Sequence, residues 1–281
     1  MKKIFCGVLF VFLVGSFVRA EQLSLEQGGP IVERGRVKAG LDDVYYSFDK
    51  TILEDASGKK LSTINNTTIV IPIEIRYGLS EKIECLMEIP YVSNTVKTKD
   101  EVLNTESEIK TSGMADIDAG LKYTFTSEEE LRISALANFG IPAGAKDLKE
   151  GFDIEPGIAV TKMMGESLVT ANIRYRMTGE YTDSFDLKQN LGDIIKIGGA
   201  YAYPVGDYLF LITELIYESF GKLETAGVEV ADSSGSRLGL VLGSRYEHDM
   251  FDIELGLDIA LGDESARDYD YKVICDFLYK F

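Results

Sequence analysis

Charged side chains recur at every second position in many segments of this chain. Glu74 and Arg76 are spaced in this way, and so are Arg174 and Arg176. A spacing of two places side chains on the same face of an extended strand, because successive residues point to opposite sides. A face that carries both signs can form cross-strand ion pairs, or it can line a wet passage whose charges select solutes. We expect ion pairing or solute selection from these residues.

Residues suited to bond-making chemistry are scarce. The chain has one histidine, His248, and it lies in a predicted two-residue turn where it is solvated. This removes the usual serine–histidine arrangement of hydrolases. No CxxC, HExxH or phosphate-binding loop is present, and the acids at 100–108 and 263–268 lack the regular spacing of a calcium loop. The sequence predicts no enzyme, no cofactor and no metal site.

The elements that carry the charged positions read as twelve β-strands. In one of them Ile69, Ile71, Ile73 and Ile75 alternate with residues that include Glu74, which is the pattern of a strand between unlike solvents. Most of these segments have the length of tilted membrane strands. The predicted strands cover residues 36–48, 66–77, 83–97, 113–126, 130–141, 152–163, 167–179, 191–203, 207–220, 236–247, 250–261 and 269–281.

The connections between these segments alternate in length. Short turns are predicted at 78–82, 127–129, 164–166, 204–206 and 248–249, and longer loops at 49–65, 98–112, 142–151, 180–190, 221–235 and 262–268. With both termini on one side, every short turn falls on the terminal side. Outer-membrane barrels sort their periplasmic turns and extracellular loops in the same way. We therefore predict an all-β fold, a transmembrane antiparallel β-barrel of twelve strands, over residues 36–281.

The apolar faces of the strands must contact lipid in such a barrel, because the reverse assignment would expose acids to hydrocarbon. Outward tyrosines and phenylalanines gather toward strand ends, as the two aromatic belts of a membrane barrel require. The inward positions then hold charges of both signs. The predicted lumen-lining residues are Glu74, Arg76, Glu84, Glu88, Asp116, Asp118, Lys122, Arg132, Asp153, Glu155, Arg174, Arg176, Glu214, Glu218, Arg237, Arg245, Glu254, Asp258 and Asp276. Two interpretations stay open: a selective pore, and a closed lumen braced by salt bridges.

The last segment, from Tyr269 to Phe281, alternates an apolar face that includes Tyr269 with a mostly polar one. It should pair with residues 36–48 and so remove the free edge of the sheet. The pattern around Asp42 and Asp43 is irregular, and we expect a β-bulge there. The aromatic C-terminus resembles the assembly signal of bacterial outer-membrane barrels. That resemblance assigns Phe277, Tyr279 and Phe281 to recognition by the outer-membrane assembly machinery.

The N-terminus has the form of a secretory signal peptide. Two lysines precede an apolar run from Ile4 to Val14, and a signal-peptidase site fits after Ala20. The run is shorter than the ~20 apolar residues that a spanning helix needs. We predict residues 1–20 as a cleaved Sec-type signal peptide. Residues 21–35 are a lead segment, either periplasmic or tucked into the lumen.

Without that peptide the formal charge of the chain is −20. Such acidity argues against nucleic acid or anionic lipid surfaces as partners.

Several blocks of sequence together resemble one family. They are RYGLSEKIECLMEIPYV (Arg76 to Val92), SGMADIDAGLKYTF (Ser112 to Phe125), ANFGIPAG (Ala137 to Gly144) and FDIEPGIAVTKMMGE (Phe152 to Glu166). They are similar to successive motifs of the outer-membrane β-barrel transporter family of the phenol-degradation meta-pathway type, with Ala115 in place of one glycine. The resemblance covers most of residues 66–180. It implies a barrel channel in the outer membrane and carries no site residues.

The sequence thus predicts a protein of the bacterial outer membrane whose partners are membrane lipid and the assembly machinery. Its expected function is passive uptake of small solutes, including aromatic or hydrophobic ones. The alternative is a structural or surface-interaction barrel with a closed, salt-bridged lumen.

Overall fold

The computed structural model describes residues 32–281 except 56, 128–130, 184–185, 231–232 and 262–268. The predicted signal peptide and residues 21–31 of the predicted lead segment lie outside the described residues. No helix within the described part of the chain has both the length and the apolar content needed to cross a membrane. The strands of the main sheet are β1 (Val37–Glu54), β2 (Lys60–Ser80), β3 (Ile83–Asp100), β4 (Thr105–Met114), β5 (Ile117–Ser127), β6 (Leu131–Ile141), β7 (Asp153–Met164), β8 (Ser167–Arg176), β11 (Ile194–Pro204), β12 (Leu209–Phe220), β15 (Gly235–Glu247), β16 (Phe251–Ala260) and β17 (Tyr271–Lys280).

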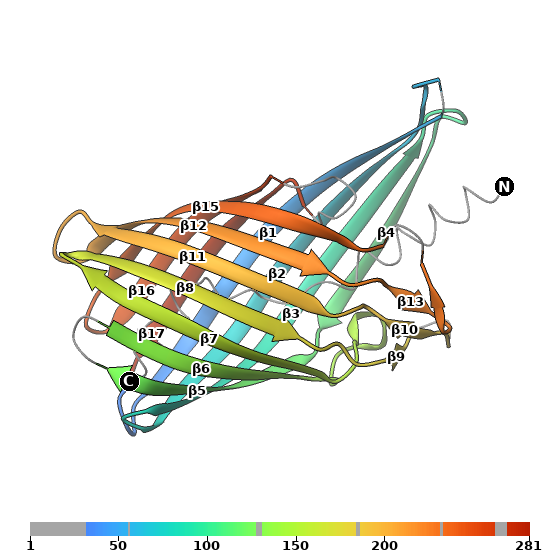
Figure 1. Ribbon diagram of the computed structural model, residues 1–281. Helices are drawn as coiled ribbons and strands as arrows, with labels where there is room; N and C mark the ends of the chain where they lie inside the picture. Colours follow the sequence, from blue (N-terminus) through green and yellow to red (C-terminus); the bar gives the residue numbers. More distant parts are fainter. Residues whose placement is uncertain (1–31, 56, 128–130, 184–185, 231–232, 262–268) are drawn as a thin grey trace.

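These strands form one closed antiparallel barrel (Figure 1). Each strand pairs with its neighbours in the chain, and the sheet closes where β1 pairs with β17. β4 and β5 follow one another along β3 and are separated only by Ala115 and Asp116, so they act as one barrel strand. The prediction of a twelve-stranded antiparallel barrel is confirmed.

The closing pair lies where the sequence predicts it. Lys38 is opposite Lys280 and Phe48 is opposite Tyr271, in one continuous antiparallel ladder. The register shifts between Leu41 and Val44, and Asp43 has a φ of 56°. This is the predicted bulge. One extra residue in the strand turns both Asp42 and Asp43 inward, and both are buried.

Two of the predicted long loops are wrong. Residues 49–65 and 98–112 are mostly strand, because β1 continues to Glu54, β2 begins at Lys60, β3 ends at Asp100 and β4 begins at Thr105. Figure 1 shows β1 to β4 projecting as a ribbon beyond the other strands. These residues were predicted as loops because they are polar on both faces. Both faces of this ribbon contact solvent, so the alternation of apolar and polar residues is absent. Continuous pairing still satisfies their backbone groups.

The other long connections carry short elements. The loops that follow β8 and β12 contain β9 (Tyr181–Thr182), β10 (Lys188–Asn190), β13 (Glu224–Thr225) and β14 (Val228–Glu229), which pair as a separate small sheet. The loop between β6 and β7 contains the 3-10 helix η2 (Lys146–Leu148). Gly144 and Glu150 of this loop, on either side of η2, donate backbone hydrogen bonds to Asp116, at 2.8 and 2.7 Å. This loop is therefore fastened to the junction of β4 and β5.

Side-chain exposure alternates along the barrel strands. On β2, Ile69 to Tyr77 alternate between exposed apolar residues and buried residues of the inner face. The apolar outer face is the one that the sequence assigns to lipid. Tyr123 and Phe125 contact each other edge to face on this surface, and so do Tyr279 and Phe281. The inner face therefore carries the polar residues that the next section describes.

Candidate functional site: the charged lumen

The structure buries most of the charged residues that the sequence assigns to the lumen. Only Asp118, Arg132 and Arg176 of the predicted set are half-buried. The buried members are Glu74, Arg76, Glu84, Glu88, Asp116, Lys122, Asp153, Glu155, Arg174, Glu214, Glu218, Arg237, Arg245, Glu254, Asp258 and Asp276. The positive and negative charges are not evenly distributed around the barrel. On one side the acids are bound by arginine or lysine, and on the other side acids outnumber bases.

On β7 and β8, one carboxylate is held by two arginines. Glu155 binds Arg174 Nη1 at 3.0 Å and Arg176 Nε at 2.8 Å. The acid and Arg174 are both buried, so these bonds replace the water that the charges lose. Each oxygen of Glu155 has its own partner. The predicted basic pair on β8, Arg174 and Arg176, is thus neutralised in part by Glu155 on the neighbouring strand β7.

A second paired group continues this wall on β11, β12 and β15. Glu218 lies between Lys196, whose Nζ is 2.9 Å away, and Arg237, which binds its other oxygen. All three side chains are almost fully buried. We call β7, β8, β11, β12 and β15 the paired wall.

One aromatic residue of this region was wrongly placed by the sequence. Tyr269 was predicted on the outer apolar face, but it is 1% exposed and donates its hydroxyl hydrogen to Asp258. The cations of Arg237 and Lys272 lie over its ring, 4.7 and 4.2 Å from the centroid. Because β17 begins only at Tyr271, the alternation does not extend back to this residue.

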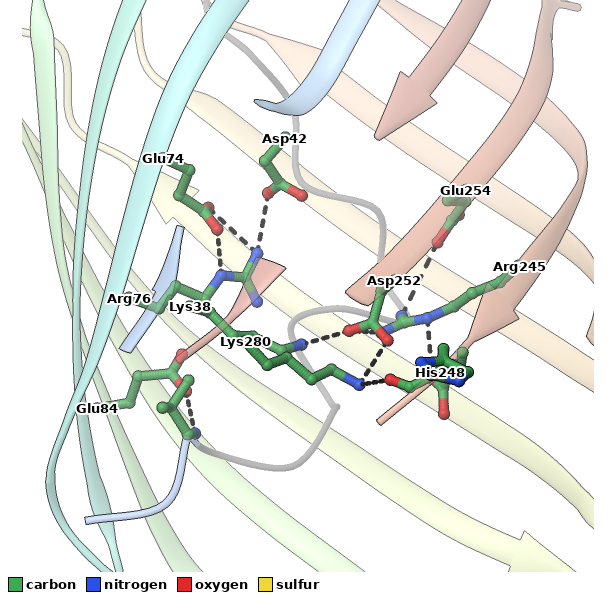
Figure 2. Close-up of polar contacts among 12 residues, drawn as sticks. Lys38, Asp42, Glu74, Arg76, Glu84, Arg245, His248, Asp252, Glu254 and Lys280 are labelled. Atoms are coloured by element: carbon green, nitrogen blue, oxygen red, sulfur yellow. Dashed lines mark hydrogen bonds and ion pairs between the residues drawn. The ribbon is translucent and has the colours of Figure 1, made fainter. Parts of the chain in front are cut away.

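The opposite side, formed by β1, β2, β3 and β5, holds more acids than bases at its centre. Arg76 binds Asp42 Oδ2 at 2.9 Å and also binds Glu74 (Figure 2). One cation thus serves two buried carboxylates. The bulge in β1 causes this, because it places Asp42 and Asp43 on the inner face together. We call β1, β2, β3 and β5 the acidic wall.

Glu88 is the centre of the acidic wall. In the register of the sheet it lies opposite Glu74 on β2 and opposite Asp118 on β5. It is 3% exposed, and its Oε1 has no hydrogen-bond partner. Among the described residues it has no ion pair either. Residues directly opposite on neighbouring strands have Cβ atoms about 4.5 to 5.5 Å apart, so like charges there repel.

A third charged group lies on the adjacent strands β15, β16, β17 and β1, near the chain termini. Asp252 accepts Lys38 Nζ at 2.8 Å and Lys280 Nζ at 2.6 Å, and Arg245 lies close by (Figure 2). Lys280 also donates to the backbone oxygen of His248 at 2.9 Å. His248 is in the turn between β15 and β16, as predicted. The sequence analysis gave no role to Lys38.

The described end of the lead segment lies against the acidic wall. The backbone N–H of Val32 donates to Glu84 Oε2 at 2.6 Å, and Val32 is buried. Arg34 bridges to Gly78 in parallel orientation, and Gly35 donates to the Gly78 oxygen at 2.8 Å. The chain is thus fastened at the ends of β2 and β3 before β1 begins.

Apolar residues occupy the inner face beside the acids, which the sequence analysis missed. Tyr45, Val70, Val92 and Leu148 belong to one buried apolar cluster. The sequence did contain a sign of this cluster. On β2 and β3 some inward positions are apolar, although the outward positions of the same strands are apolar too. Leu148 comes from η2, so the loop between β6 and β7 packs into this cluster.

No group of three or more metal-ligating side chains among the described residues is arranged to hold a metal ion. Of the two predicted acidic loops, residues 100–108 form the hairpin between β3 and β4, and residues 263–268 lie outside the described part.

Neither a scan against protein-family models nor a search of curated proteins found a match. Solved structures are similar at low sequence identity. An outer membrane channel from Pseudomonas putida F1 superimposes with a TM-score of 0.65 and 14% identity, over 90% of this chain and 97% of that chain. The translocator domain of the autotransporter NalP from Neisseria meningitidis gives 0.50 and 12%, over 88% and 87%. The transport unit of the autotransporter AIDA-I from Escherichia coli gives 0.50 and 10%, over 88% of both chains. The fold is therefore that of outer-membrane β-barrels.

Proposed function

We propose that this protein is an outer-membrane channel through which small solutes pass passively. The observation that carries the proposal is a closed twelve-stranded barrel whose outer face is apolar and whose inner face bears charges from almost every strand. Charged side chains inside a membrane protein are candidates for lining a solute pathway. The fold neighbour from P. putida F1, described as an outer membrane channel, adds support.

Aromatic or otherwise hydrophobic compounds are the proposed solutes. The resemblance of residues 66–180 to the phenol-degradation type of transporter supports this choice. The proposal includes export through a cleaved signal peptide and assembly through the C-terminal strand; Phe281, which directly follows β17, is exposed.

The alternative is a structural or surface-interaction barrel with a closed lumen. A specific observation favours it, since Glu74 and Glu214 are fully buried and ion pairs cross between strands of the paired wall. Such packing braces a barrel without conducting. In the channel interpretation, these groups must separate or rearrange when a solute passes.

One experiment separates the two functions. The full-length chain is expressed in a Gram-negative host, and the mature protein is taken from the outer-membrane fraction, where its N-terminus should be Glu21. After reconstitution into planar bilayers we expect discrete conductance steps, with heat-unfolded protein as the control. A folded barrel that conducts no ions, and whose vesicles take up benzoate no faster than protein-free vesicles do, would establish the closed-lumen alternative.

A further inference from the structure

The loop between β6 and β7 contributes a leucine to the interior of the barrel. Leu148 of this loop is 7% exposed and belongs to the buried apolar cluster of the inner face. We call this cluster the apolar plug. Its members include Tyr45, Val70, Val92, Leu148, Val241 and Ile274. Most of them are wall residues, whereas Leu148 is added to them from a loop.

The apolar plug closes the lumen at its own level. Its wall residues lie on β3, β2, β1, β17 and β15, which extend over about half of the ring of strands. An inward side chain of an open barrel would keep contact with water. Val70 and Val92 point inward and are nevertheless 0% exposed, so they are covered from the lumen side. A solute that moves along the barrel axis must displace what covers them.

One carboxylate holds the loop on both sides of Leu148. Asp116, which is buried, accepts the backbone N–H of Gly144 at 2.8 Å and that of Glu150 at 2.7 Å. Ala145 adds a backbone hydrogen bond to the oxygen of Met114 at 2.8 Å. Hydrogen bonds to an ionised carboxylate are stronger than those between neutral groups. We call the two bonds to Asp116 the latch.

The loop lies close against β4 because β4 has a glycine there. A Cβ at Gly113 would be 3.1 Å from Ala145 Cβ and 3.5 Å from Leu148 Cδ1. Gly113 is opposite Val92 in the register of the sheet, so Leu148 lies beside this part of the apolar plug. The latch and this contact lie outside the ladders that join the barrel strands. The loop can therefore leave while the barrel stays paired.

We propose that the loop between β6 and β7 is the gate of the channel, with Leu148 as the residue that closes the lumen and Asp116 as the residue that holds it closed. The inference rests on the proposed channel function and concerns the regulation of that same lumen. Release of the latch withdraws Leu148 and uncovers Val92 and its neighbours. Lids and loops that open in this way control access to many protein interiors.

A disulfide can lock the gate. The substitutions Gly113→Cys and Ala145→Cys are made together in a chain that also carries Cys85→Ala and Cys275→Ala. Disulfides have Cβ atoms about 3.5 to 4.5 Å apart, so a shift of about 1 Å lets this bond form. In planar bilayers we expect the oxidised variant to conduct at least about tenfold less than the same protein after reduction with dithiothreitol. Equal conductance in the two redox states would refute the gate.

Two further substitutions should open the gate. Asp116→Ala removes the acceptor of the latch, and Leu148→Ala shortens the residue that closes the lumen. We expect each to raise the conductance at least about tenfold over the wild type. Leu223→Ala is the matched control, because Leu223 is a buried leucine of the loop between β12 and β15 and is not part of the apolar plug. A rise of the same size in this control would show that any loosened loop increases conduction.

An accessibility measurement separates the gate from the channel function. Val92→Cys, again with Cys85→Ala and Cys275→Ala, is treated with a water-soluble methanethiosulfonate reagent. We expect the thiol to react at least about tenfold faster when Asp116→Ala is added. If the reaction accelerates and no variant conducts, the channel proposal fails and the gate stands. If the wild type conducts and neither the lock nor the release changes conductance or reaction rate, the channel stands and the gate is wrong.

Discussion

Glu88 and Glu155 are the same residue type, point to the same lumen and are each 3% exposed, yet their surroundings are opposite. Glu155 on the paired wall is held by two arginines. Glu88 on the acidic wall has acids opposite it on both neighbouring strands. Burial therefore does not distinguish a carboxylate bound by cations from one surrounded by acids. The partners of the charge do.

The difference has an energetic meaning. A buried ion pair offsets part of the cost of desolvating its two charges, so Glu155 and Glu218 of the paired wall lose less on burial than an unpaired acid would. An uncompensated buried acid keeps that cost, and groups with unfavourable electrostatics concentrate at functional sites. The paired wall is thus suited to holding the barrel shape.

The largest expected effect comes from removing the shared cation of the acidic wall. Arg76→Met leaves Asp42 and Glu74 without their arginine beside Glu88, and we expect a loss of about 3 to 5 kcal/mol in the free energy of unfolding. Arg174→Met should cost less, about 1.5 to 3 kcal/mol, because Glu155 keeps Arg176. Equilibrium unfolding in urea, with the barrel in phospholipid vesicles, measures both. An equal or larger loss in Arg174→Met would contradict the contrast between the walls.

Neutralising the two matched acids should change stability in different directions. Glu155→Gln leaves the buried Arg174 and the half-buried Arg176 without a carboxylate, and we expect a loss of about 1.5 to 3 kcal/mol. Glu88→Gln removes repulsion from its neighbours, so the free energy of unfolding should rise or stay within about 0.5 kcal/mol of the wild type. The same urea titrations report both values. A clear destabilisation by Glu88→Gln would show that this acid has a structural partner.

The barrel itself could be predicted from the sequence because its physical cause is local and repetitive. Alternation along each strand fixes which side chains face lipid, and closure follows from the need to pair the edges of the sheet. The pairing of residues 36–48 with the last strand and the bulge at Asp42 and Asp43 were both confirmed. The alternation and the irregularity at Asp42 and Asp43 are read from near neighbours in the chain, and the closing pair follows because the first and last strands are the two edges left over.

Features that depend on distant partners were beyond the sequence. The alternation places Glu88 and Glu155 on the same face but does not show which cation reaches each of them. Tyr269 was misplaced because it lies just before β17 begins, where the alternation has ended. In the folded barrel its side chain turns inward to Asp258 and Lys272. The extended hairpins of β1 to β4 were missed because polar composition resembles a loop when both faces of a ribbon are wet.

The acidic wall also contacts the segment before β1, at Gly78. Adding one methyl group at Gly78, and at an uncrowded glycine elsewhere, tests how firmly this segment is held. A Cβ at Gly78 would overlap the backbone oxygens of Val32 and Glu33, whereas a Cβ at Gly206, in the turn between β11 and β12, would meet nothing within 4 Å. We expect Gly78→Ala to cost about 1 to 3 kcal/mol and to release the segment, because backbone cannot move aside as easily as a side chain. Gly206→Ala should stay within about 0.5 kcal/mol. Hydrogen exchange at the amides of Val32 and Gly35 measures the release, since both donate hydrogen bonds to this wall. Unchanged protection of these two amides in Gly78→Ala would show that the segment is held by other contacts.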